Sequence, residues 1–195
     1  MPSNSVTIRH AAVDAPVLLL VYGLTRVFDG LDGSYDPGGL LWNIGHLATF
    51  IAMALFVLLA VTARRLAPPG TRGLADLAAA VTVTGVACFL WLITAALAPA
   101  LHETGPPLAV LATAGPLLFA LGMLTTLGLL VAARQVPAWS PLLFGAGIAA
   151  VLVSLDSLPI AALILLAALA PLARPHPTPS GSTAPAPLIT TSSGG

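Results

Sequence analysis

Four side chains of this sequence have the chemistry expected of a catalytic centre: Asp29, His46, Glu103 and Asp156. A carboxyl group can serve as a general acid, and an imidazole can act as a base or can orient the acid beside it. Each of the four residues stands near the end of an apolar segment. If those ends lie together, the four side chains would suit an enzyme that acts on a lipid-like or isoprenoid substrate.

The same segments hold five polar residues that suit binding instead: Arg26, Asp32, Asn43, His46 and His102. The planar guanidinium of Arg26 matches phosphate or carboxylate groups. The simpler hypothesis is an ion pair between Arg26 and Asp29 or Asp32 that holds the end of a helix, because an uncompensated charge is expensive near a membrane. Asn43 and His46 are three residues apart, which places them on one side of a helix.

A metal or haem site needs His46 and His102 together, since imidazole is a good ligand for both groups. We expect His102 about 10 Å closer to the membrane surface than His46, so we favour a hydrogen-bonded, helix-packing role for His46. The acidic run that begins at Asp32 resembles the start of a calcium loop, but Pro37 stands where that loop needs its glycine. We therefore predict no metal and no cofactor.

Asp156 allows two interpretations. It is a turn residue between two helices, or its apolar neighbours favour the protonated form and let it carry or donate a proton. The motifs of known membrane enzymes do not help, because the sequence contains no HExxH, no GxSxG and no phosphate-binding loop or dinucleotide fingerprint. The question of an enzyme stays open, and we lean toward a protein without catalytic activity.

Composition identifies the class of protein that positions these residues. Of the 195 residues, 57% are hydrophobic and only 7% are charged, against about 25% charged in ordinary globular proteins. All basic side chains are arginines and the formal net charge is zero, so nothing supports nucleic-acid binding. The lone cysteine, Cys88, excludes an internal disulfide. We expect an all-α integral membrane protein.

Apolar segments of suitable length predict a six-helix transmembrane bundle with short loops. The expected spans cover residues 14–28, 39–63, 74–98, 108–133, 138–155 and 158–173. Asp14 is expected to cap the first helix, with Pro16 in its first turn. Residues 138–173 leave an alternative, a pair of re-entrant half-helices buried in protein. Residues 174–195 are rich in Pro, Ser and Thr and predict a disordered tail.

The distribution of charge predicts the orientation. With six spans, one side of the membrane receives these arginines: Arg9, Arg64, Arg65, Arg72, Arg134 and Arg174. The other side receives these acidic residues: Asp29, Asp32, Asp36, Glu103 and Asp156. Because arginine-rich loops stay in the cytoplasm, we expect both termini to be cytoplasmic. The expected location is the plasma membrane, which is the inner membrane of a bacterium, with several passes.

Three hypotheses for function remain. The first is a non-enzymatic bundle that binds a partner subunit, a lipid or a small solute at its outer polar rim. The second is the small enzyme described above, with Asp29, Glu103 or Asp156 as the acid and His46 as the base or orienting group. The third is a proton- or ion-coupled carrier that uses Asp156 and His46. Expected partners are membrane lipid, a membrane protein or a second copy of the chain.

Overall fold

The computed structural model describes residues 3–31, 38–97 and 108–174, and within these ranges the chain is helical and contains no strand. The six α-helices are α1 (Ser3–Asp29), α2 (Leu40–Ala63), α3 (Arg72–Leu97), α4 (Leu108–Ala132), α5 (Trp139–Val153) and α6 (Leu158–Ala173). Short 3₁₀ turns connect some of them: η1 (Arg64–Leu66), η2 (Pro69–Thr71) and η4 (Leu155–Ser157). The all-α fold class and the six helices predicted from the sequence are confirmed.

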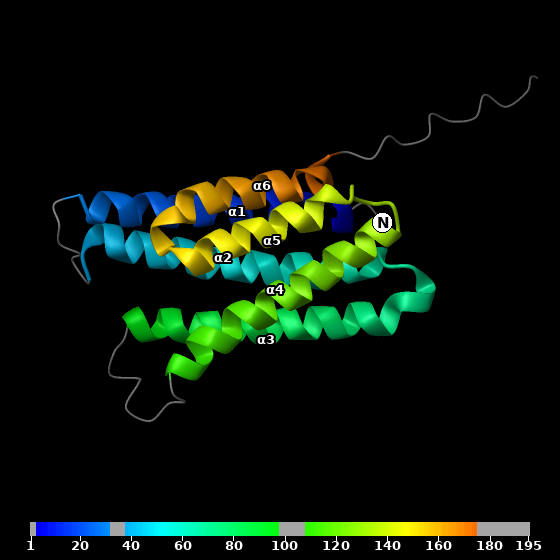
Figure 1. Ribbon diagram of the computed structural model, residues 1–195, viewed down its shortest axis with the longest axis horizontal. Helices are drawn as coiled ribbons and strands as arrows, with labels where there is room; N and C mark the ends of the chain where they lie inside the picture. The colour runs from blue at the N-terminus through cyan, green and yellow to red at the C-terminus, as the bar shows by residue number, and fades with distance from the viewer. Residues whose placement is uncertain (1–2, 32–37, 98–107, 175–195) are drawn as a thin grey trace, which may run out of the picture.

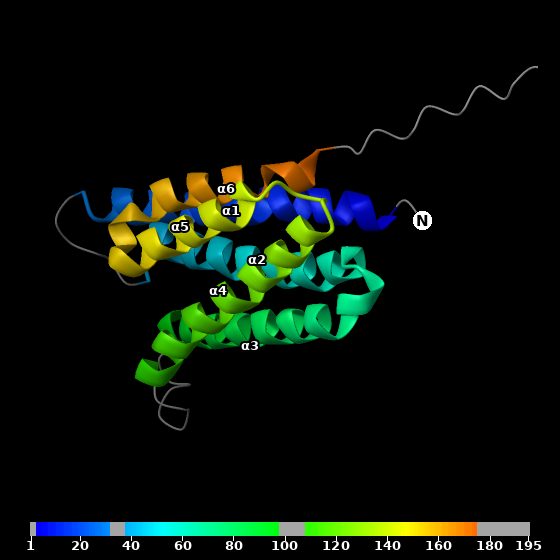
Figure 2. The ribbon, with the colours of Figure 1, turned by 45° about the vertical axis from the view of Figure 1, so that its right-hand side comes forward.

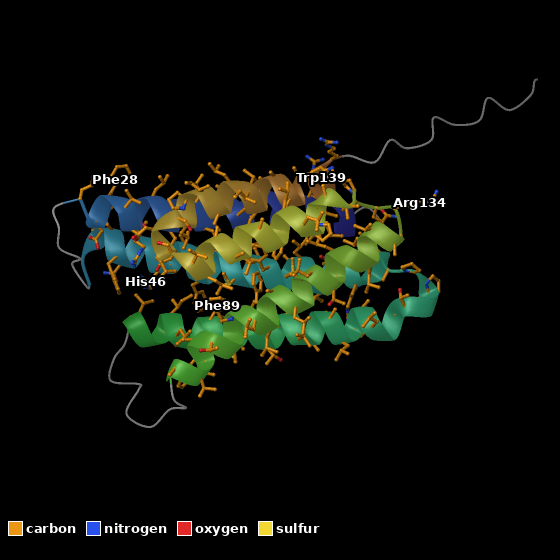
Figure 3. All side chains as sticks on the ribbon, in the orientation of Figure 1. Phe28, His46, Phe89, Arg134 and Trp139 are labelled. Carbon is orange, nitrogen blue, oxygen red and sulfur yellow. The ribbon has the colours of Figure 1, made fainter. Side chains whose placement is uncertain are left out.

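Successive helices run in opposite directions, so the connections gather at two ends of the bundle (Figure 1). The basic end, as we call it, holds the α2–α3 and α4–α5 connections with Arg64, Arg65, Arg72 and Arg134. The acidic end holds the α5–α6 connection with Asp156 and the end of α1 with Asp29. Phe28 and His46 lie toward the acidic end, whereas Arg134 and Trp139 lie at the basic end (Figure 3).

Five of the described helical segments are long and apolar enough to cross a membrane. They are Val6–Asp29, Leu40–Leu66, Pro69–Thr94, Ala109–Ala132 and Leu155–Ala173. The exception is α5, which is apolar but only 15 residues long. Length and composition therefore suggest a membrane protein, and α5 is shorter than the other five apolar helices.

The first helix begins at Ser3, eleven residues earlier than the start near Asp14 that the sequence suggested. Asp14 is therefore not an N-cap; its Oδ2 lies 3.9 Å from Nδ1 of His10, one turn earlier. Pro16 lies inside the helix. The helix continues through this proline because one face of its first half is buried: Ala12 and Ala15 are fully shielded where α1 packs against α2 and α6. Burial of that face outweighs the lost hydrogen bond.

Glycines allow α3 and α4 to cross closely. A Cβ atom at Gly85 would overlap the backbone nitrogen of Phe119, and one at Gly115 would lie 2.9 Å from Cβ of Cys88. At Gly122 the added atom would overlap Oγ1 of Thr82 and lie 2.7 Å from the carbonyl oxygen of Ala78. Close backbone approach through small residues is a common mode of helix association in membranes. These contacts hold α3 and α4 as one hairpin.

An aromatic cluster joins the hairpin to α2 and α5. Phe56 of α2, Phe119 of α4 and Phe144 of α5 are each at most 2% exposed. The ring centroid of Phe56 lies 5.1 Å from that of Phe119 and 6.4 Å from that of Phe144, with edge-to-face geometry in both pairs. Beyond this cluster α4 runs obliquely, away from α5 and toward the acidic end (Figures 1 and 2).

Candidate functional site

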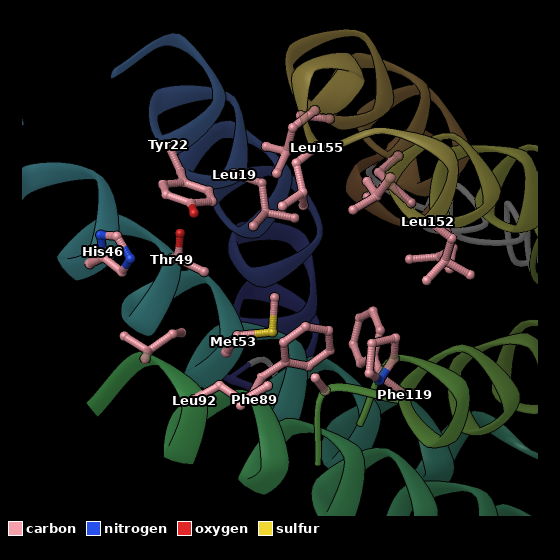
Figure 4. Close-up of a pocket in the computed structure, with 18 residues that line it drawn as sticks. Leu19, Tyr22, His46, Thr49, Met53, Phe89, Leu92, Phe119, Leu152 and Leu155 are labelled. Carbon is pink, nitrogen blue, oxygen red and sulfur yellow. The ribbon is translucent and has the colours of Figure 1, made fainter. Parts of the chain in front are cut away.

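The oblique course of α4 leaves a cavity of about 480 Å³ in the half of the bundle next to the acidic end. Each helix contributes residues spaced by three or four along one face. Representative lining residues are Tyr22 of α1, His46 of α2, Phe89 of α3, Phe119 of α4, Ile148 of α5 and Ala162 of α6. Figure 4 shows the side chains around this space. The volume lies in the range of small-molecule binding sites, roughly 300–1,000 Å³.

The polar lining of the cavity is confined to one side. Tyr22, His46 and Thr49 supply it, and the other lining side chains are aliphatic residues, phenylalanines, a methionine and a proline. The hydroxyl groups of Tyr22 and Thr49 point toward one another beside the His46 ring (Figure 4). The cavity therefore offers a small polar corner and a large apolar body, which is the arrangement that an amphipathic molecule requires.

His46 is only 7% exposed, and its ring is held in a defined orientation. Its Nδ1 lies 2.8 Å from the carbonyl oxygen of Trp42, one turn earlier in α2. A carbonyl oxygen can only accept, so Nδ1 carries the hydrogen, and the neutral ring is left with Nε2 as an acceptor. The ring centroid lies 4.2 Å from that of Trp42 and 5.5 Å from that of Tyr22. The imidazole is thus fixed by one hydrogen bond and two aromatic neighbours.

Gly45 makes this corner possible by letting α1 approach α2. A Cβ atom at Gly45 would lie 2.9 Å from Cδ2 of Tyr22, closer than real Cβ contacts come. A larger residue would push α1 and the Tyr22 ring away from His46. Thr49 is fixed as well, because its Oγ1 donates a hydrogen bond to the Gly45 carbonyl oxygen at 3.1 Å. The Thr49 oxygen can therefore only accept a further hydrogen bond.

A second, much smaller niche of about 10 Å³ lies next to the polar corner and shares Tyr22 and His46 with it. Arg26, Asp29 and Trp42 also line this niche. Oδ1 of Asp156 lies 3.7 Å from Nε of Arg26, so an ion pair joins α1 to the α5–α6 connection. The sequence alone suggests Asp29 or Asp32 as partners of Arg26, and only folding brings Asp156 close to it.

The candidate catalytic residues that the structure describes do not gather around the cavity. His46 lines it, Asp29 lines only the niche, and the Asp156 side chain is 77% exposed at the acidic end. Glu103 lies outside the described residues. Within the ranges that the structure describes, no carboxylate lines the cavity and no group of three His, Cys, Asp or Glu residues is placed to hold a metal ion.

The remaining binding candidates are placed as follows. Asn43 is exposed near the start of α2, where its Nδ2 donates a hydrogen bond to the Gly38 carbonyl oxygen at 2.8 Å, and it lines neither cavity. Asp32 and His102 lie outside the described residues. The aspartate loop and a histidine pair therefore stay predictions. Arg26 and His46 are the binding candidates that the structure does place beside the niche or the cavity.

Sequence reasoning placed the candidate site at the outer rim and missed the cavity below it. The apolar lining residues, such as Phe89 and Ile148, look like ordinary helix-packing residues in the sequence. The spacing of three from Asn43 to His46, which Thr49 continues, is the sequence feature that indicates a polar face. The chain matches no protein-family model, no curated protein sequence and no solved structure. Function is therefore inferred from the cavity itself.

Proposed function

We propose that this chain is a multi-pass membrane protein whose helix bundle binds a lipid-like molecule in the cavity between the helices, without catalysing a reaction on it. The observation that carries the proposal is the cavity of about 480 Å³ with all of its polar lining at one corner. Such a space fits a molecule with one polar group and an apolar body. Among a partner subunit, a lipid and a small solute, the lipid fits this lining best. The proposed binding site therefore lies in the interior of the bundle and not at its outer rim.

The exterior of the bundle supports insertion in a membrane. Many large apolar side chains are exposed on its helices, for example Leu142 at 74%, Ile160 at 64% and Leu121 at 60%. Their contact with water would be unfavourable, whereas contact with lipid chains is not. The arginines of the basic end support a cytoplasmic orientation for that end and for both termini. The plasma membrane, which is the inner membrane of a bacterium, is the proposed location.

In the proposed topology, α5 and α6 form a hairpin that crosses the bilayer. Fifteen residues of α5 span about 22 Å at 1.5 Å per residue, which is less than the roughly 30 Å of hydrocarbon. A bilayer can thin locally around a short helix at modest cost. The exposed carboxylate of Asp156 at the tip of this hairpin supports the crossing, since a buried re-entrant tip would hold that charge away from water.

A non-enzymatic role is favoured by the surroundings of His46. Its Nδ1 is bound by a backbone carbonyl oxygen rather than by a carboxylate that could stabilise a positive ring during catalysis. No described carboxylate lines the cavity to act as a general acid beside it. Ligand binding requires neither a carboxylate at Nδ1 of His46 nor a general acid in the cavity.

Photolabelling tests the proposal directly. The protein is reconstituted in phosphatidylcholine nanodiscs, irradiated with a dodecanol that carries a diazirine on its alkyl chain, and digested for peptide mapping. We expect labels on cavity residues of α3 and α5, such as Phe89 and Ile148. Ala112→Trp would fill the cavity and reduce these labels, whereas Val110→Trp, on the exposed face of the same helix, would not. Labels spread evenly over lipid-facing residues, and equal in both variants, would contradict the proposal.

A further inference from the structure

The hydrogen-bonding character of the polar corner restricts the chemistry of the ligand. This inference rests on the proposed function, because it concerns the head group of the molecule that the cavity binds. Nε2 of the neutral His46 ring is an acceptor, since Nδ1 donates its hydrogen to the Trp42 carbonyl oxygen at 2.8 Å. Oγ1 of Thr49 has given its hydrogen to the Gly45 carbonyl oxygen. His46 and Thr49 can therefore only accept further hydrogen bonds, and Nε2 of His46 is the acceptor in the imidazole ring.

The orientation of the imidazole directs its acceptor inward. Trp42 precedes His46 by one turn of α2, so the hydrogen bond from Nδ1 points back along the helix. The other ring nitrogen lies on the side of Thr49 and the cavity (Figure 4). Stacking against Trp42 and the edge contact with Tyr22 oppose rotation of the ring. A ligand that enters the cavity meets an acceptor in a fixed position.

The cavity lining also excludes charge on the ligand. No Arg, Asp or Glu is among the described residues that line it. The nearby Arg26 lines the separate niche and has Asp156 at 3.7 Å, so it does not offer a positive charge inside the cavity. An anionic head group placed at the corner would lose its hydration without gaining a cation, and it would face the acceptor Nε2 of His46.

We propose that the cavity selects an uncharged amphiphile whose head group donates a hydrogen bond to Nε2 of His46, as a long-chain alcohol does. Ethers and esters lack the required hydrogen, and phosphates bring a charge that the lining does not compensate. The alkyl chain of the alcohol lies among the apolar residues of α3 to α6. His46 is the residue that distinguishes one head group from another.

Three tritiated probes with the same chain test the proposal: dodecanol, dodecyl methyl ether and dodecyl phosphate. Binding to the full chain in phosphatidylcholine nanodiscs is measured against empty nanodiscs, so that partition into lipid is subtracted. We expect dodecanol to bind about tenfold more tightly than the ether, as one net hydrogen bond provides, and the phosphate to bind weakest. Equal affinity for alcohol and ether, or tightest binding of the phosphate, would overturn the proposal.

Paired substitutions assign the preference to one side chain. His46→Phe keeps an aromatic ring of similar size but removes Nε2, so dodecanol should fall to the affinity of the ether while the ether is unaffected. His10→Phe is the matched control, because His10 is 67% exposed at the other end of α1. If His46→Phe does not fold, the comparison of probes on the unchanged protein still decides the question.

Failure of this inference is distinguishable from failure of the proposed function. If all three probes bind equally and Ala112→Trp abolishes their binding, the cavity binds lipid-like molecules but His46 does not select among them. If no probe exceeds the empty nanodiscs, both the inference and the proposed function are wrong.

Discussion

A pair of glycine substitutions in one helix tests the packing of α3 against α4. At Gly122 a Cβ atom would lie 2.6 Å from the backbone nitrogen of Thr82 and 2.7 Å from the Ala78 carbonyl oxygen, about 0.7 Å short of ordinary contact at 3.4 Å. At Gly128 an added Cβ meets nothing within 4 Å. The same Gly→Ala change therefore strains one position and leaves the other free.

The two substitutions should change the free energy of unfolding in opposite directions. Both changes gain helix propensity, about 1 kcal/mol each. Gly122→Ala also forces two backbones apart, and overpacking of this kind destabilises by about 1–3 kcal/mol. Thr82 cannot move aside easily, since it is fully buried and its Oγ1 donates to the Ala78 carbonyl oxygen at 2.9 Å. Because the propensity gain is common to both variants, the difference between them should be the overpacking energy alone.

The assay is unfolding in mixed micelles with increasing dodecyl sulfate, followed by loss of helical circular dichroism. We expect Gly128→Ala to unfold at higher and Gly122→Ala at lower dodecyl sulfate than the unchanged protein. Thr82→Ala added to Gly122→Ala should recover only part of the loss, because the clashes with backbone atoms remain. Equal stability of the two glycine variants would refute the close α3–α4 crossing.

Three further predictions concern the aromatic cluster, the ion pair and the topology. Phe56→Ala should lower the unfolding free energy by about 3–5 kcal/mol. Phe50→Ala, at a 37% exposed position of the same helix, should change it by no more than about 0.5 kcal/mol. Similar losses in the two variants would argue against the aromatic cluster. Asp156→Asn should cost at most about 1 kcal/mol, because its carboxylate is 77% exposed and 3.7 Å from the guanidinium; a larger loss, or one insensitive to salt, would contradict a solvated pair. In a background without the natural cysteine, Ser154→Cys should react with an impermeant maleimide from outside intact cells and Thr71→Cys only after permeabilisation; a protected Ser154→Cys would favour a re-entrant α5–α6.

Local features of the sequence were sufficient to predict the helices and unable to predict the cavity. The predicted end of the second helix near Ala63 agrees with the structure, because a long apolar run ending at an arginine pair needs no information from other helices. The start of the first helix was wrong by eleven residues. There Asp14 and Pro16 gave local cap and first-turn signals for a helix start, and burial of Ala12 and Ala15 overrode them.

The candidate site also combines one residue that the sequence identifies with others that only the fold brings together. His46 was identified from its type and its place near the start of an apolar helix, and the prediction of a hydrogen bond within the packed helices matches its contact with Trp42. Its neighbours in the cavity, such as Phe89 and Ile148, carry no functional sign in the sequence. They become a lining only because α4 diverges from α5 beyond the aromatic cluster.

By itself the sequence determined the all-helical class, the approximate extent of most helices and the separation of the other arginines, Arg26 excepted, from the carboxylates of the acidic end. These properties depend on residues close together in the chain, since helix length and the apolar character of a segment are local. The tertiary structure alone decided the pairing of Arg26 with Asp156, the close α3–α4 crossing and the position of the cavity. Each of these depends on how residues far apart in sequence pack, and packing is set by the shapes of the facing surfaces rather than by either segment alone.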